Sequence, residues 1–137
     1  MIVDVGCGTG EWVIEVAEEF PTAYVYGLDL SPIQPTYVPD NAEFIVTDIS
    51  EGMPDFDDGR TDVVHSRFCI SAIALIRYLH AGITRDQWPV YLQEILRILK
   101  PNDGWAQMIE LGIPYVHSEN DSLPPDAPLS KVAHFDT

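Results

Sequence analysis

The sequence alternates short apolar runs with amphipathic segments, and this alternation constrains the fold more than any other feature. The short runs are rich in branched and aromatic side chains and predict β-strands. Segments with apolar residues on one helical face predict α-helices. We expect strands at residues 1–5, 23–30, 42–48, 61–67 and 104–111, and helices at 11–20, 68–82 and 88–100. Because such alternation joins parallel strands by crossovers, the pattern predicts a doubly wound, mostly parallel α/β sheet.

Proline and charge mark the segments between these elements. Residues 31–41 contain three prolines and are expected to form a loop without a helix. Residues 51–60 are expected to form an acidic loop. The last predicted helix carries an apolar stripe of Leu92, Ile95, Leu96 and Leu99. We expect one folded domain at 1–111 and an irregular, proline-containing tail at 112–137.

The charge of the chain limits its partners. The formal net charge is −15, so the surface repels nucleic-acid phosphates and anionic lipids, and we expect neither nucleic acid nor membrane as a partner. No apolar run reaches the ~20 residues that span a bilayer, and no signal peptide is recognisable. Two cysteines within apolar patterns are typical of free thiols in a reducing compartment. A cytoplasmic or nuclear location is therefore expected.

Three glycines, Gly6, Gly8 and Gly10, alternate directly after the first predicted strand. Ligands of open parallel sheets bind beyond the carboxyl ends of the strands, where the winding reverses. Glycine tolerates positive φ and has no side chain, so a ligand can approach the backbone there. A tight turn without a ligand is the alternative for this stretch alone.

A carboxylate stands at the matching position of the second strand. Asp29 closes that strand nineteen positions after Gly10, where nucleoside-binding folds place an acid that accepts the ribose hydroxyls. The stretch DLSP also suits a turn that Asp29 would cap. Glu11 stands where a third dinucleotide glycine would be expected, which disfavours NAD and FAD. A positively charged adenosine derivative without phosphate fits the glycines and the acidic chain better.

A family resemblance agrees with this ligand. The ordered motifs VDVGCGTG, GLDLS, VTDIS, DVVHSR and LKPNDGW resemble those of class I S-adenosylmethionine-dependent methyltransferases, over residues 1–111. The stretch GLDLSPIQPTYVPDNAEFIVTDI, with HSR downstream, is similar to the fungal LaeA-like group, which is tied to the control of secondary metabolism. The resemblance implies a Rossmann-like sheet of strand order 3-2-1-4-5. It also implies S-adenosylmethionine as the cofactor and methyl transfer to a small-molecule or protein acceptor.

The resemblance further implies roles for single residues along the cofactor. Asp4 would orient the methionine end through water, and Asp29 would hold the ribose. Leu30 would pack on the adenine, while Asp48 would accept its amino group, with Ile49 beside the ring. The glycine wall of the site would consist of Gly6, Gly8 and Gly10. The residues near the transferred methyl group would be His65, Ser66 and Arg67.

Two of these residues have structural alternatives. Asp48 also suits the start of a turn into the acidic loop. His65 is the candidate general base, because imidazole titrates near neutral pH, yet such a histidine is more often a hydrogen-bonded structural residue. Methyl transfer needs little from side chains, since the cofactor carries the leaving group, and the catalytic residue stays unassigned. No metal-ligand spacing is present among His, Cys and the carboxylates, so no metal is expected.

The chain also departs from the family pattern. The family normally has helices before the first strand and two further strands after the fifth, so we expect a fragment or a truncated gene product. Two functions from different classes follow: a methyltransferase domain, or a non-catalytic adaptor of the same fold that binds a partner protein. An NAD-linked oxidoreductase is disfavoured by Glu11. Without the missing strands, the fifth strand would be an exposed apolar edge that favours self-association.

Overall fold

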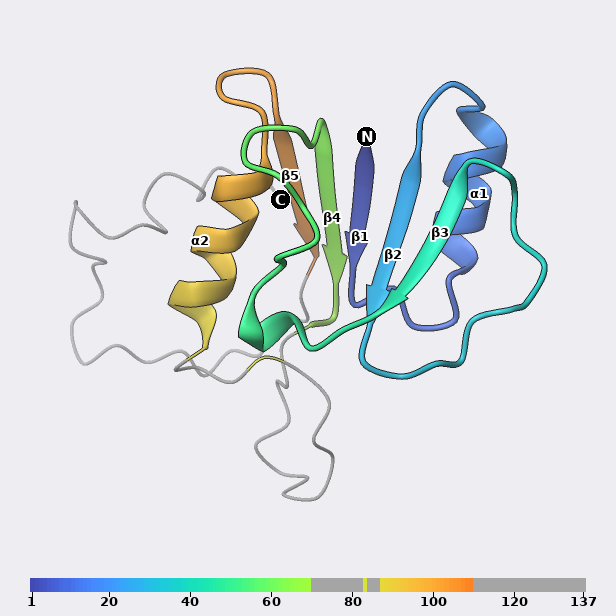
Figure 1. Cartoon of the computed structure of the whole chain (residues 1–137), viewed down its shortest axis with the longest axis horizontal. Helices are drawn as coiled ribbons and strands as arrows, with labels where there is room; N and C mark the ends of the chain where they lie inside the picture. The colour runs from blue at the N-terminus through green and yellow to red at the C-terminus, as the bar shows by residue number, and fades with distance from the viewer. Residues whose placement is uncertain (70–82, 84–86, 110–137) are drawn as a thin grey trace.

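A single five-stranded sheet forms the centre of the computed structural model, which describes residues 1–69, 83 and 87–109 (Figure 1). The strand order is β3-β2-β1-β4-β5, and every neighbouring pair is parallel. The strands are β1 (Ile2–Val5), β2 (Val25–Asp29), β3 (Ala42–Val46), β4 (Val63–Arg67) and β5 (Trp105–Ile109). The helices are α1 (Glu11–Glu19), the short 3₁₀ helix η1 (Ile49–Glu51) and α2 (Trp88–Ile98). The predicted α/β class and the strand order 3-2-1-4-5 are confirmed.

Most predicted elements are present with slightly shorter bounds. Each of the five predicted strands contains the observed one, and residues 31–41 contain no helix or strand, as the prolines predict. The helix predicted at 68–82 lies almost entirely outside the described residues, and Phe68, with φ of 58°, is not helical. The predicted tail at 112–137 also lies outside them. None of the helices in the described part of the chain has the length and apolar character of a membrane span.

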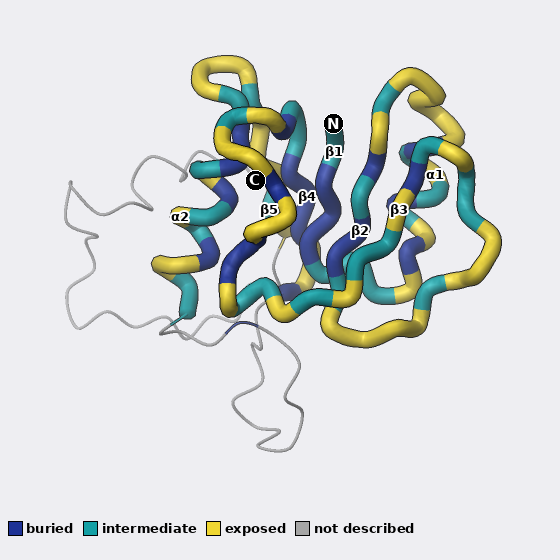
Figure 2. The backbone as a smooth tube through the Cα atoms, viewed as in Figure 1, coloured by how far each residue is buried: buried dark blue, intermediate teal, exposed yellow. Residues whose placement is uncertain are grey.

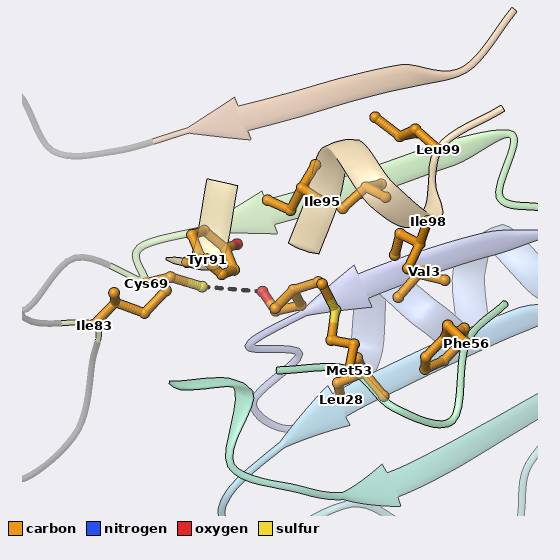
Figure 3. Close-up of a cluster of buried hydrophobic side chains, with 12 residues drawn as sticks. Val3, Leu28, Met53, Phe56, Cys69, Ile83, Tyr91, Ile95, Ile98 and Leu99 are labelled. Carbon is orange, nitrogen blue, oxygen red and sulfur yellow. Dashed lines mark hydrogen bonds between the residues drawn. The ribbon is translucent and has the colours of Figure 1, made fainter. Parts of the chain in front are cut away.

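Two apolar clusters pack on opposite faces of the sheet, because alternate residues of a strand face opposite sides. On one face, α1 buries Val13 and Ala17 against Val25 and Ala42. On the other face, α2 and the segment after η1 cover the strands with a larger cluster (Figure 3). Its members include Val3, Val5, Leu28, Met53, Phe56, Val64, Tyr91, Ile95 and Ile98. Both helices therefore hold the sheet from which the site is built.

The buried face of α2 differs from the predicted stripe. Tyr91, Ile95 and Ile98 are buried, at spacings of four and three residues, whereas Leu96 is 67% exposed. The prediction was right for Ile95 and for Leu99, which is buried just beyond the helix, and wrong for Leu96. Tyr91 brings this face inward, because its hydroxyl bonds with a buried residue of β4 while its ring packs in the core. An apolar count alone does not distinguish the two faces.

Candidate functional site

The carboxyl ends of the strands lie at one edge of the sheet, the lower edge in Figure 1. The glycine loop follows β1, Asp29 is the last residue of β2, and Asp48 follows β3. The register pairs Val5 with Leu28 and Asp29 with Val46, so these three strand ends are level. The parallel pairing therefore brings the candidate cofactor residues of β1, β2 and β3 to one place.

The three glycines of the loop share a positive φ but differ in what surrounds them. Gly6, Gly8 and Gly10 all have positive φ, of 75°, 56° and 79°. A Cβ at Gly6 would lie 2.4 Å from the Cys69 sulfur, and one at Gly10 would lie 2.3 Å from Cζ of Phe44. A Cβ at Gly8 would meet no atom within 4 Å. Packing thus excludes a side chain at Gly6 and Gly10, and Gly8 presents open backbone to a ligand.

Asp29 links the glycine loop to the start of the next loop. The backbone N–H of Gly8 donates to Oδ2 of Asp29 at 2.8 Å, and the N–H of Ser31 donates to Oδ1 at 2.8 Å. The second bond is the turn that the stretch DLSP predicts; the first bond fixes the acid beside the open glycine. Since an ionised carboxylate has about four acceptor positions, Asp29 retains acceptor capacity for a ligand.

A side chain that the sequence analysis did not single out completes this arrangement. Nε2 of Gln34 donates to the Gly8 carbonyl at 2.7 Å and to the Ser31 carbonyl at 2.9 Å. Gln34 is half-buried, while the other residues from Ser31 to Tyr37 are exposed. The signal in the sequence was an amide between two prolines in SPIQP, but loop sequence alone does not indicate its partners.

Asp4 and His65 form a buried pair beneath the loop. They are register partners on β1 and β4, each about 3% exposed, and Nδ1 of His65 lies 2.7 Å from Oδ1 of Asp4. Because a carboxylate accepts, Nδ1 carries the proton in this bond. The Trp12 ring stacks on the His65 ring with centroids 3.9 Å apart. The pair and the indole connect the central strands to the first turn of α1.

The residues predicted to contact the adenine follow the carboxyl ends of β2 and β3. Leu30 is 57% exposed, Asp48 is exposed, and Ile49 is partly buried against the larger core cluster. Asp48 accepts the Ser50 N–H at 2.9 Å and caps η1, so the turn alternative is present. Hydrogen bonding from Ser50 holds the pKa of Asp48 below its usual range, which keeps this exposed carboxylate ionised.

The side chains at the end of β4 differ in exposure. Ser66 is fully buried, and the Tyr91 hydroxyl donates to its Oγ at 2.8 Å. Beside them the Cys69 thiol donates to the Val5 carbonyl at 3.0 Å, as Figure 3 shows. Arg67 is exposed. The Ser66 hydroxyl therefore lies within the core between β4 and α2, and its predicted cofactor role remains a prediction.

Cys7, within the glycine loop, is chemically protected. Burial, followed by the nearby carboxylates of Asp4 and Asp29, raises the pKa of the Cys7 thiol to about 12. The thiol therefore stays protonated at neutral pH and is a poor nucleophile. In the described part of the chain, no three His, Cys, Asp or Glu side chains are grouped closely enough to hold a metal ion.

Comparison with known proteins agrees with this geometry. The methyltransferase domain family matches residues 2–102. The chain is 35% identical over 130 residues to the secondary metabolism regulator LAE1 of Cochliobolus heterostrophus, covering 95% of this chain and 38% of that protein. It is 32% identical over 134 residues to the methyltransferase pytC of Aspergillus terreus, covering 97% of this chain and 36% of that protein. The chain thus spans little more than a third of these curated relatives.

A solved structure shows the same fold. The plantazolicin methyltransferase BpumL, in complex with SAH, superposes with a TM-score of 0.60 at 22% identity, over 81% of this chain and 38% of that one. The glycine loop, the parallel strand order and the family match lead to one assignment. The chain belongs to the methyltransferase domain family of class I S-adenosylmethionine-dependent proteins, and within it to the LaeA-like group.

Proposed function

We propose that this chain binds S-adenosylmethionine where β1 and β2 end, as the cofactor-binding part of a methyltransferase. The observation that carries the proposal is the bond between the open glycine and the acid. Gly8 leaves its backbone unobstructed, and its N–H donates to Asp29 at 2.8 Å. A backbone wall thus adjoins a carboxylate with free acceptor positions, which suits a ribose with two neighbouring hydroxyls.

The residues around this centre fit the rest of the cofactor. The exposed Leu30 offers an apolar surface to the adenine, and the ionised Asp48 offers an acceptor to its amino group. Asp4, paired with His65, underlies the loop and is proposed to act on the methionine end through water. The net charge of −15 favours a cationic ligand over a pyrophosphate.

When bound, the cofactor supplies a methyl group on a good leaving group. The contribution of the chain is to bind and orient, because alignment alone can supply several kcal/mol of rate enhancement. His65 contacts Asp4 and Trp12, so we propose that it supports the glycine loop and does not act as a general base. The acceptor is a small molecule or a protein, and the names of the relatives favour a role connected with secondary metabolism.

A second candidate function is a non-catalytic adaptor that binds a partner protein. The observation in its favour is the exposed apolar surface of β5, on which Trp105 is 75% exposed and Ile109 is 41% exposed. The two functions differ in turnover. A methyl-transfer assay with fungal extract as the acceptor source distinguishes them: an adaptor binds the cofactor without transferring the methyl group.

Titration calorimetry of the purified chain with S-adenosylmethionine, S-adenosylhomocysteine and NAD tests the proposal. We expect both sulfur compounds to bind and NAD to bind far more weakly. Asp29→Ala is expected to weaken binding by roughly 2–4 kcal/mol, because two bonds to a charged acceptor are lost. A chain that binds NAD alone, or an Asp29→Ala variant as tight as the parent, would contradict it.

A further inference from the structure

We propose that Gln34 is a positioning residue of the nucleoside site, where its side-chain amide holds Gly8 and Asp29 in the arrangement that receives the ribose. This inference rests on the proposed cofactor site. It adds a specific residue from the loop between β2 and β3, which carries no helix in this protein. The set of hydrogen bonds made by Gln34 and Asp29 is called the Gln34 bridge below.

In the Gln34 bridge, Gln34 and Asp29 bind the same two residues, Gly8 and Ser31. Asp29 accepts the N–H groups of Gly8 and Ser31, each at 2.8 Å. Gln34 donates to the carbonyls of Gly8 and Ser31, at 2.7 and 2.9 Å. The Asp29 carboxylate and the Gln34 amide therefore bind the main-chain N–H and the main-chain carbonyl of both Gly8 and Ser31. The primary amide of glutamine has two N–H donors, which matches the two carbonyls.

The loop that carries Gln34 has few main-chain bonds of its own. Pro32 and Pro35 flank Gln34 and have no N–H to donate. Among the described residues, the hydrogen bond from the Ile33 N–H to the Ser31 carbonyl is the only main-chain bond within 31–38. Side-chain bonds therefore decide where this loop lies relative to the glycine loop, and Gln34 is the residue of the loop that reaches across.

The consequence concerns the backbone of Gly8. Gly8 has φ of 56° and meets no neighbouring atom at its open side, so packing does not hold it as Phe44 holds Gly10. Its position depends on the bonds to Asp29 and Gln34. Losing the amide frees the loop to move away from Asp29, and ligand binding must then order it again, at a cost in affinity.

The substitution that tests the chemistry most narrowly is Gln34→Glu. It keeps the shape of the side chain but replaces the donor by a carboxylate, which faces two carbonyls and lies near Asp29. Gln34→Ala removes the side chain without adding charge. Gln93→Glu is the matched control, because Gln93 is exposed on α2, far from the loop in sequence.

The experiment is titration calorimetry of these variants with S-adenosylhomocysteine, combined with thermal unfolding without ligand. We expect Gln34→Glu and Gln34→Ala to weaken the affinity roughly tenfold or more, and Gln93→Glu to change it less than about twofold. A double-mutant cycle with Asp29→Ala then tests the mechanism. Because Gln34 acts through Asp29 and Gly8, Gln34→Ala should have less than about a twofold effect in the Asp29→Ala background.

Each other outcome overturns the inference. Unchanged affinity of Gln34→Glu and Gln34→Ala, with parental binding intact, refutes the role of Gln34 and leaves the proposed function standing. A full effect in the Asp29→Ala background shows that Gln34 acts separately from the acid. If Gln34→Glu and Gln34→Ala lower the thermal unfolding midpoint without ligand by equal amounts, the residue supports the fold instead of the site. A parent chain that does not bind refutes the proposed function and this inference together.

Discussion

The strands β1 and β5 run in the same direction in one sheet, yet their surroundings differ. β1 lies between β2 and β4, and three of its four residues are buried. β5 pairs with β4 alone among the described strands, and four of its five residues are exposed (Figure 2). The proposed cofactor residues at the ends of β1 and β2 therefore lie on buried central strands, while the β5 side carries exposed apolar surface.

The largest effect on stability is expected at Gly10, in the loop that follows β1. Gly10 has φ of 79°, and a Cβ added there would lie 2.3 Å from the Phe44 ring, so Gly10→Ala combines backbone strain with overpacking. We expect a loss of roughly 3–5 kcal/mol in the free energy of unfolding, measured by urea denaturation. A loss of only about 1–2 kcal/mol, which backbone strain alone accounts for, would show that the Phe44 ring moves aside easily.

Gly8→Ala is the matched control for that substitution. It has positive φ without a neighbour, so about 1–2 kcal/mol of stability should be lost from backbone strain alone. Its affinity for S-adenosylhomocysteine should nevertheless fall, because the added methyl group stands where the ligand approaches. Parental affinity would show that the ligand does not contact this glycine.

The next effect concerns the polar contacts that hold α2 to the acidic loop. Glu94 accepts the Met53 N–H at 2.9 Å and bonds to Arg97, and these bonds hold the pKa of Glu94 below its ordinary value. A depressed carboxyl pKa stabilises the fold above the unfolded pKa, and this contribution is lost as the pH falls through the folded pKa. Glu94→Gln should therefore cost about 1–2 kcal/mol at pH 7 and progressively less in acid.

Urea denaturation of Glu94→Gln and of the parent across acidic and neutral pH measures this difference. Gln93→Glu is the control, because Gln93 is exposed and lies one position before Glu94 on the same helix. A gap between Glu94→Gln and the parent that stays constant from neutral pH into acid would exclude ionisation of Glu94 as its cause.

The smallest effect on stability is expected at the exposed strand. Trp105→Lys should change the free energy of unfolding by less than about 0.5 kcal/mol, because the side chain is 75% exposed. The same substitution should lower self-association, since a charge on an edge strand opposes pairing with a second chain. Light scattering over a concentration series measures this. A loss above about 2 kcal/mol would show that another part of the protein packs on Trp105.

The elements of the fold differ in how far the sequence predicts them. Apolar runs predict strands such as β1 well, because a buried strand must be apolar whatever its neighbours are. The stripe of α2 was partly wrong, since Leu96 and Ile98 are equally apolar and only the position of Tyr91 decides which face is buried. The spacing from the glycines predicts Asp29 as a ribose acceptor, and the stretch DLSP predicts it as a turn cap. The bond from the Ser31 N–H shows the cap, and the ribose role remains a prediction.

Gln34 could not be predicted in the same way. Its partners, Gly8 and Ser31, are main-chain carbonyls, and any residue type can supply a carbonyl. A bond from a loop side chain to a distant backbone group leaves no pattern of spacing or apolarity in the sequence. The pairing of Asp4 with His65 is similar, because it depends on the register of β1 against β4.

We propose that the ligand binds at the ends of β1 and β2 and leaves β5 unaffected. Amide hydrogen exchange of the whole chain, with and without saturating S-adenosylhomocysteine, tests it in one measurement. We expect slower exchange at Gly8 and Ser31, whose N–H groups donate to Asp29, and unchanged exchange across Trp105–Ile109. Protection confined to β5, or no protection at Gly8 when the ligand is bound, would show that the ligand binds elsewhere.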